Sequence, residues 1–547
     1  MTDISTAAER TSERGATHHA PTPLLARIAR FSARRPRMIV AFWLLLIVIA
    51  APLAIGVNGV LSGAGWDARG SESAQVRSEL QTAFPGFSPD SAVVVYQQSE
   101  PVTADSPGLT MLLDALASAP GATGVTNPFA VPAEAGLISA DGKTVLIPVA
   151  LAGTEDADLP ESAGKLIGFV NGAALPEGSR AAVTGEWPMW SDFNKTNEEA
   201  LHKAELLSGV PSLIFLFLAF GAALAAGIPL LLAVGGIAFG FGALYLLGSA
   251  VPLSVWAMNF SMMIGLAVGI DYSLFIVSRY REERWAGKSA GDAIETALST
   301  SGFAVLLSAL SVILSLAVIF IVPVMVFQSM ALGMMLSVAA VAVASLTLLP
   351  AVLMLLGDRV LVTRSRKKSS SDHVAKIGIW ERWTGFALNR PGPALLAGLA
   401  LLLALVVPAL GMKLGMPDAR VVEEGRSSRD GFEMLVSAFG DGAAAPIYVI
   451  TPAQNAGVIT ALAAGIDGAE GARIVTPPNA ADRVVIQVTP SAAAGDASTT
   501  RLIDTLRDES RAIAPATLVG GPAAQSHDLT AVLTGRAPYA IGIIMLG

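Results

Sequence analysis

The chain has 547 residues, of which 53% are hydrophobic and only 15% are charged, and its mean hydropathy is +0.58. This composition excludes most soluble proteins and is typical of an integral membrane protein. The sequence contains no cysteine, which excludes disulfide bonds and thiolate metal sites. The formal net charge of −8 hides an uneven distribution, because acidic residues gather in two polar regions and basic residues gather in short segments beside apolar runs.

Apolar runs of about 20 residues, long enough to cross a bilayer, alternate with these polar regions. We therefore expect a multi-span α-helical membrane protein. The predicted segments are a basic leader at 1–37, a first span at 38–57, a polar domain at 58–205, five further spans within 206–356, a basic segment at 357–392, a seventh span at 393–412, a second polar domain at 413–536, and the start of an eighth span at 537–547.

Both polar domains show the same order of predicted elements. After a first amphipathic helix at 73–84, the first domain is predicted to run β-α-β-β-α-β, and the second follows the same order. This order favours a ferredoxin-like α+β sandwich in each domain. The pairs Arg35-Pro36 and Arg390-Pro391 each precede a span, which indicates a parallel internal repeat of the kind found in transporters.

Basic residues indicate the topology. The leader, the loop at 279–300 and the segment at 357–390 are rich in Arg and Lys and fall on one side of the predicted membrane. The positive-inside rule places that side in the cytoplasm and both polar domains outside it. Trp187 and Trp190 precede the second span, where we expect interfacial anchors, with a lipid entrance as the alternative.

The predicted span within 256–283 carries Asp271, and no other residue between Leu206 and Ser278 is charged. A carboxylate at membrane depth costs roughly 2.5–3.5 kcal/mol on insertion scales, so it marks a functional site by default. Asp271 lies eight residues before Arg279, or about 12 Å along a helix. We expect neighbouring helices to bury Asp271 so that it exchanges a proton near neutral pH. A purely structural carboxylate, hydrogen-bonded to another helix, is the alternative.

Residues next to Asp271 sharpen this hypothesis. Gly265 and Gly269 form a GxxxG pair, which lets a second helix approach closely. Tyr272 lies on the same stripe of the helix as these glycines, and its hydroxyl is available as a partner or relay for Asp271. Small residues are common in membrane helices, so the GxxxG pair alone is a weak signal.

The stretch GLAVGIDYSLFIVSRYREE, which contains Asp271, resembles the fourth-helix signature of the MMPL branch of the resistance-nodulation-division transporters. Residues 300–317 resemble the next helix of that family. The resemblance implies porter-type outer domains, Asp271 as proton acceptor and donor, Tyr272 as its partner, and Ser308 beside this relay. It also implies five further helices with a second Asp-Tyr pair, so we expect this chain to be a truncated form of a longer transporter.

The sequence motifs give little support for nucleotide binding, metal binding or catalysis. Gly287-Lys288-Ser289 is similar to the end of a phosphate-binding loop, but Glu282 replaces the required first glycine, so ATP binding is rejected. His18 and His19 stand without other metal ligands. No nucleophile-base-acid set is recognisable. We therefore expect no enzyme activity, no cofactor, no metal and no nucleic-acid partner, with an ion gradient as the energy source.

The leading hypothesis is a transporter in a bacterial plasma membrane, driven by the proton gradient, that exports lipids or other amphipathic compounds. Its expected partners are the substrate and membrane lipids, and a homo-oligomer or accessory membrane proteins are left open. The alternatives are a non-transporting membrane scaffold or lipid sensor, and a drug efflux pump of the same superfamily.

Overall fold

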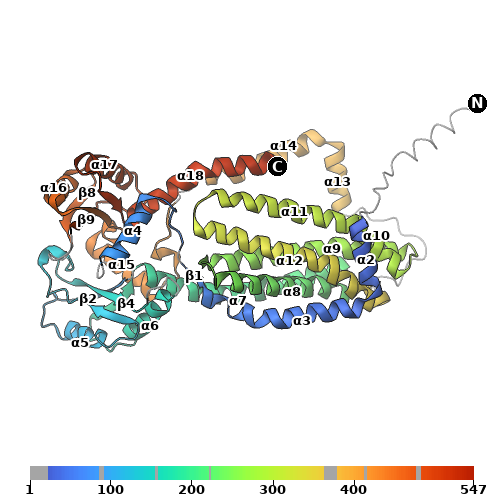
Figure 1. Ribbon diagram of the computed structural model, residues 1–547, viewed down its shortest axis with the longest axis horizontal. Helices are drawn as coiled ribbons and strands as arrows, with labels where there is room; N and C mark the ends of the chain where they lie inside the picture. Colours follow the sequence, from blue (N-terminus) through green and yellow to red (C-terminus); the bar gives the residue numbers. More distant parts are fainter. Residues whose placement is uncertain are drawn as a thin grey trace, which may run out of the picture.

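The structure is a computed structural model that describes residues 23–63, 65–84, 91–153, 158–220, 223–361, 379–411, 415–475 and 482–546. A bundle of long helices carries two αβ units at one of its ends (Figure 1). Within these described ranges, six helices are long and apolar enough to cross a membrane, or seven if a bent pair counts as one span. Residues 1–22 of the predicted leader and 362–378 of the predicted basic segment lie outside the described residues.

The long helices of the bundle have mainly apolar sequences, and several expose leucine and isoleucine side chains on their outer faces, as lipid-facing helices do. At the centre of the bundle, α12 packs against α3, α8, α9 and α11. The bounds of the long helices are α3 Pro36–Ile55, α7 Glu186–Phe220, α8 Ala223–Gly248, α9 Trp256–Trp285, α11 Phe303–Ala317, α12 Met325–Leu356, α14 Pro391–Val406 and α18 Pro522–Leu546.

Two of these helices begin earlier than the change in composition predicts. Helix α7 starts at Glu186 inside the first αβ unit and continues without a break past residue 206. Helix α18 starts at Pro522 in the second unit and likewise passes the predicted boundary at 537. The reason is that backbone hydrogen bonds carry a helix from polar into apolar surroundings, so a change in side-chain polarity need not end it.

Short helices lie at the opposite end of the bundle from the αβ units (Figure 1). They are α2 Pro23–Arg34, α10 Ala290–Ala297 and α13 Ile379–Asn389. Helix α2 packs against α10 and α12. Helix α13 meets α14 at a bend of 105°. None of these helices was specified by the sequence analysis.

Each αβ unit is built on a four-stranded antiparallel sheet with two helices between its strands. The sheet orders are β3-β4-β2-β5 and β8-β9-β7-β10, so the two units share one topology. The bounds of the first unit are β2 Ser91–Gln98, α5 Pro107–Leu116, β3 Ala122–Val125, β4 Thr144–Leu151, α6 Leu159–Asn171 and β5 Ser179–Thr184. Those of the second are β7 Ile447–Pro452, α16 Ala456–Gly465, β8 Ala469–Ile474, β9 Arg483–Pro490, α17 Ala497–Ile513 and β10 Leu518–Gly520.

The two units exchange a helix. Helix α4 (Glu72–Ala83) precedes the first sheet in the chain but packs on the second, where Val76 and Leu80 join a core with Ile450. Helix α15 (Ser427–Phe439) makes the reciprocal contact with β5 of the first unit. The exchange corrects the expectation that the helix at 73–84 belongs to the first domain. Helix periodicity predicts that a helix has an apolar face but does not identify the sheet that covers it.

The two tryptophans predicted for the membrane interface are instead buried in the first unit. Trp187 and Trp190 are both 0% exposed and belong to the core of that unit. They lie in the first turns of α7, which are part of the αβ unit, and this early helix start explains the difference.

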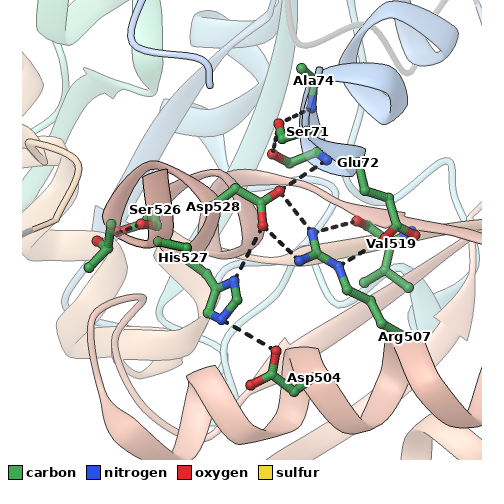
Figure 2. A network of polar contacts seen from close by, with 12 residues as sticks. Ser71, Glu72, Ala74, Asp504, Arg507, Val519, Ser526, His527 and Asp528 are labelled. Atoms are coloured by element: carbon green, nitrogen blue, oxygen red, sulfur yellow. Dashed lines mark hydrogen bonds and ion pairs between the residues drawn. The ribbon is translucent and has the colours of Figure 1, made fainter. Parts of the chain in front are cut away.

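A network of charged groups fastens α4 to the second unit (Figure 2). Arg507 of α17 forms two hydrogen bonds, of 2.7 and 2.9 Å, with the Asp528 carboxylate of α18. The Arg507 Nε atom lies 3.1 Å from the Glu72 carboxylate of α4. Burial alone would lower the pKa of Arg507, but the two carboxylates raise this pKa above its ordinary value.

The same network satisfies the N-terminus of α4. The Ser73 backbone N–H donates to Asp528 at 3.2 Å, and Glu72 accepts a hydrogen bond of 2.8 Å from the Val519 N–H of β10. Asp528 therefore joins two parts of the chain that are far apart in sequence, namely the start of α4 and Arg507 of α17.

We expect Asp528→Ala to destabilise the protein strongly. Removing this carboxylate takes away both Asp528 hydrogen bonds of the part-buried Arg507 and the acceptor of the Ser73 N–H, and breaking a buried pair of this kind costs about 3–5 kcal/mol. Thermal unfolding of the purified protein in detergent measures the effect. Glu161→Ala, in the exposed Glu161–Lys165 pair, is the control and should cost less than about 1 kcal/mol. Equal losses in the two variants would contradict the role of the network.

Candidate functional site

Helix α9 carries the isolated carboxylate and connects the two ends of the bundle. It spans Trp256–Trp285, and Asp271 lies at its middle. Its closest neighbours are α12 and α8. Polar contacts also hold α9 to α12, because the Ser261 hydroxyl hydrogen-bonds the Gly333 carbonyl at 3.0 Å and the Ser337 hydroxyl at 2.5 Å.

Both glycines of the GxxxG pair face α8. A Cβ atom built on Gly269 would lie 2.8 Å from the Cβ atom of Ala233, and one built on Gly265 would lie 2.9 Å from Ile237. Both distances are shorter than a carbon–carbon contact allows. The helices therefore approach one another at positions where only glycine fits, and this contact fixes the rotation of α9 about its axis.

With α9 held in this rotation, Tyr272 points into the bundle. Its side chain is 3% exposed and belongs to the main core cluster of the membrane helices. The Tyr272 hydroxyl lies 3.5 Å from the Ser308 hydroxyl of α11, at the long limit of a hydrogen bond. Ser308 itself is exposed. Two of the predicted relay residues are thus brought together, one buried and the other at the edge of the bundle.

Asp271, in contrast, is exposed, which corrects the expectation that neighbouring helices bury it. It shares a stripe of α9 with Met263, Ala267 and Phe275, all of which are exposed as well. Residues four apart lie on one face of a helix, and the glycine face that packs on α8 is a different one. Within the described residues, Asp271 has no hydrogen bond or ion pair.

A junction between the bundle and the αβ units escaped the sequence analysis. Trp66 stacks on Trp190 at 6.2 Å and meets Trp256 edge-on at 6.0 Å, while Phe193 lies 5.2 Å from Trp256. We call these four rings, together with Phe327, which lies 6.2 Å from Trp66, the aromatic junction. Next to it, β1 (Leu61–Ser62) pairs in parallel with β6 (Leu253–Ser254). The only sequence signal was aromatic residues at the ends of apolar runs.

The aromatic junction places the start of α9 against both the first αβ unit and α12. Trp256 is the first residue of α9, Trp190 and Phe193 belong to α7, and Phe327 belongs to α12. Asp271 and the junction therefore lie on one continuous helix, about 22 Å apart at 1.5 Å per residue.

These features define a multi-span membrane protein with paired αβ units and an isolated carboxylate on a central helix. A comparison with known families gives the same class, because the MMPL family model matches residues 65–394, which include α9 and α11. The chain belongs to the MMPL family.

Two curated relatives cover most of the chain. The mycolic acid-containing lipids exporter MmpL11 of Mycolicibacterium smegmatis is 31% identical over 92% of this chain and 55% of its own length. The heme uptake protein MmpL11 of Mycobacterium tuberculosis is 30% identical over 84% of this chain and 48% of its own length. The trehalose monomycolate exporter MmpL3 of Mycolicibacterium smegmatis is 26% identical over 48% of this chain. The chain thus spans about half the length of the two MmpL11 relatives.

We expect Gly269→Val to disturb the helix bundle. The larger side chain would force α8 and α9 apart at the Ala233 contact, and overpacking of this kind costs about 1–3 kcal/mol. Thermal unfolding in detergent should show a lower midpoint. The matched control is Gly398→Val in α14, where a Cβ atom meets nothing within 4 Å. An unchanged midpoint for Gly269→Val would contradict the close packing.

Proposed function

We propose that this chain carries the proton-binding site of a membrane transporter that is driven by the proton gradient and exports lipids or other amphipathic compounds. The observation that carries the proposal is Asp271, a lone carboxylate in the middle of a membrane helix beside the buried Tyr272. In the membrane, a side chain of this kind is costly and is typically found at proton relays and ion pathways.

The exposed position of Asp271 fits this function if further helices cover it. A charged carboxylate facing lipid would cost several kcal/mol, so the stripe that contains Met263 and Asp271 calls for a protein partner. The relatives are about twice as long as this chain and have sequence available for such helices. We propose that the covered Asp271 gains and loses a proton, with Tyr272 and Ser308 completing the relay.

Proton binding at Asp271 would change the packing of α9 against its neighbours. Because α9 is one continuous helix from Asp271 to Trp256, a shift of α9 along its axis would be passed to the aromatic junction. The junction contacts α7 and the first αβ unit, and the exchanged helices α4 and α15 join that unit to the second. This path links the carboxylate to the part of the protein that we propose handles the substrate.

We propose that the αβ units are porter-type domains that lie outside the cytoplasm, and that the chain is organised as a parallel repeat. The shared sheet order of the two units supports the repeat. The basic residues of α2 and of the last turns of α9 lie at the opposite end of the bundle, which supports a cytoplasmic N-terminus. The names of the MmpL3 relative and of one MmpL11 relative support a lipid as substrate.

A second candidate is a membrane scaffold or lipid sensor that does not transport. It is favoured by one observation, namely that Asp271 forms no hydrogen bond or ion pair within the described residues. The two candidates differ in whether protons cross the membrane in the presence of a substrate.

We expect Asp271→Asn to abolish gradient-dependent export, because asparagine cannot exchange a proton. The protein should be assayed in membrane vesicles, with a pH-sensitive dye for proton flux and a fluorescent phosphatidylethanolamine analogue as the transport probe. Both signals should fall to background while the amount and melting temperature of the protein stay near those of the wild type. Asp292→Asn, at an exposed site in α10, is the control. Normal export by Asp271→Asn would refute the proposed relay.

We expect Trp256→Ala to uncouple the two ends of α9. Loss of its ring contacts removes interactions worth about 0.5–1.5 kcal/mol per aromatic pair, so transport of the lipid probe should fall roughly tenfold. Proton binding at Asp271 lies at the far end of the path and should persist. Trp383→Ala in α13, with a side chain that is 65% exposed, provides the matched control. A parallel loss of proton and lipid signals would argue against the aromatic junction as the coupling element.

A further inference from the structure

The short helix α2 has one apolar side and one basic side, and the transport proposal assigns no role to either. Its apolar side is already occupied by protein, since Leu25 and Ala29 are each 1% exposed and belong to the core of the bundle. The Ser32 hydroxyl lies 3.5 Å from the Thr347 carbonyl of α12. Helix α2 is therefore held by α10 and α12, and does not depend on inserting its apolar face into a membrane.

The opposite side of α2 and the residues that lead into α3 are strongly basic. Five exposed arginines lie within eleven positions, and no Asp or Glu occurs between Glu13 and Asp67. In the part of the chain that the structure describes, no carboxylate lies within ion-pair distance of these five guanidinium groups. The five arginines, which we call the α2 arginine row, are Arg27, Arg30 and Arg34 of α2, Arg35 directly after it, and Arg37 in the first turn of α3.

The position of this row along the bundle matches the level of lipid headgroups. Helix α2 runs across the ends of the spanning helices (Figure 1). Arg37 lies in the first turn of α3, where the following side chains Met38 and Phe42 are 46% and 58% exposed and face the region of the acyl chains. Phe31, in the middle of the row, is 50% exposed. An aromatic ring among arginines is the composition of a surface that lies against a membrane interface.

We infer that the α2 arginine row is a binding surface for the headgroups of anionic phospholipids in the leaflet at that end of the bundle. Guanidinium groups form paired hydrogen bonds with phosphate oxygens, and Phe31 enters the boundary between headgroups and acyl chains. The surface recognises lipid but does not anchor the helix, because the apolar side of α2 is buried in protein.

A lipid fits this surface better than a soluble polyanion does. The row is continuous with the lipid-facing side chains of α3, so part of it faces the membrane and is closed to a nucleic acid or an acidic protein. Phe31 adds an apolar contact that a headgroup and its acyl chains supply and that a nucleic-acid backbone does not. Because α2 packs on α10 and α12, bound lipid would also stabilise that end of the bundle.

The test uses the purified full chain in a neutral detergent, titrated with phosphatidylglycerol or with phosphatidylcholine of the same acyl chains. Phosphatidylglycerol should raise the melting temperature of the wild type more than phosphatidylcholine does. The triple variant Arg27→Gln/Arg30→Gln/Arg34→Gln should lose this difference and bind phosphatidylglycerol roughly 100-fold more weakly, at about fivefold per arginine. Its melting temperature in phosphatidylcholine should match that of the wild type, which verifies folding.

The control variant removes three exposed cations from the αβ units and should leave the preference for phosphatidylglycerol unchanged. It combines Lys143→Gln, Arg180→Gln and Arg501→Gln. Phe31→Ser, which keeps every charge, should weaken lipid binding while leaving unchanged any binding of a 12-nucleotide single-stranded DNA. Equal responses of the wild type to the two lipids would overturn the inference. So would DNA binding as tight as that of phosphatidylglycerol, since the row would then be a general polyanion site.

Discussion

The close packing of α8, α9 and α12 is the constraint on which the rest of the structure depends. Gly269 meets Ala233 of α8, and Gly333 of α12 lies against the Ala257 backbone of α9, where an added Cβ atom would be only 2.5 Å from the Ala257 carbonyl oxygen. These contacts leave α9 no freedom to rotate. One residue corresponds to about 100° of a helix, so the packing that places Tyr272 inside the bundle also places Asp271 outside it.

At the end of the bundle that carries the αβ units, the exchange of helices ties the movement of one unit to the movement of the other. Helix α4 follows α3 out of the bundle but packs on the second sheet, while α15 packs on the first. Helix α7 extends from the first unit into the bundle, and α18 leaves the second unit. A displacement of the first unit therefore pulls on α15, and a displacement of the second unit pulls on α4. A movement that begins at the aromatic junction is thereby shared by both units instead of ending in the first.

The sequence predicted what depends on local pattern. Hydrophobic length found the spans, strand and helix periodicity gave the element order of both αβ units, and the cost of a charge in lipid pointed to Asp271. It did not predict which partner each surface has. The exchange of α4, the burial of Trp187 and Trp190, and the pairing of β1 with β6 are contacts between distant segments. The exposure of Asp271 depends on which helices are present beside α9, and a single helix sequence does not contain that information.

The two exchanged helices are held by related but unequal contacts. Asp192 of α7 and Asp528 of α18 lie equally far from the starts of their helices, and each accepts a hydrogen bond from the N-terminus of an exchanged helix, at Ser428 and Ser73 respectively. In the second unit, Arg507 binds the carboxylate directly through part-buried groups. In the first, the guanidinium contact between α15 and α7 is the exposed Arg426–Glu199 pair, and exposed pairs of this kind contribute at most about 1 kcal/mol. The start of α15 is held on β5 by buried neutral hydrogen bonds as well, because the Val183 N–H donates to the Ser427 hydroxyl at 3.0 Å and the Thr184 hydroxyl donates to the Ser428 carbonyl at 2.9 Å. The first unit, which also carries the aromatic junction where motion of α9 arrives, therefore holds its exchanged helix mainly by neutral hydrogen bonds, and the second unit holds its own by buried charges.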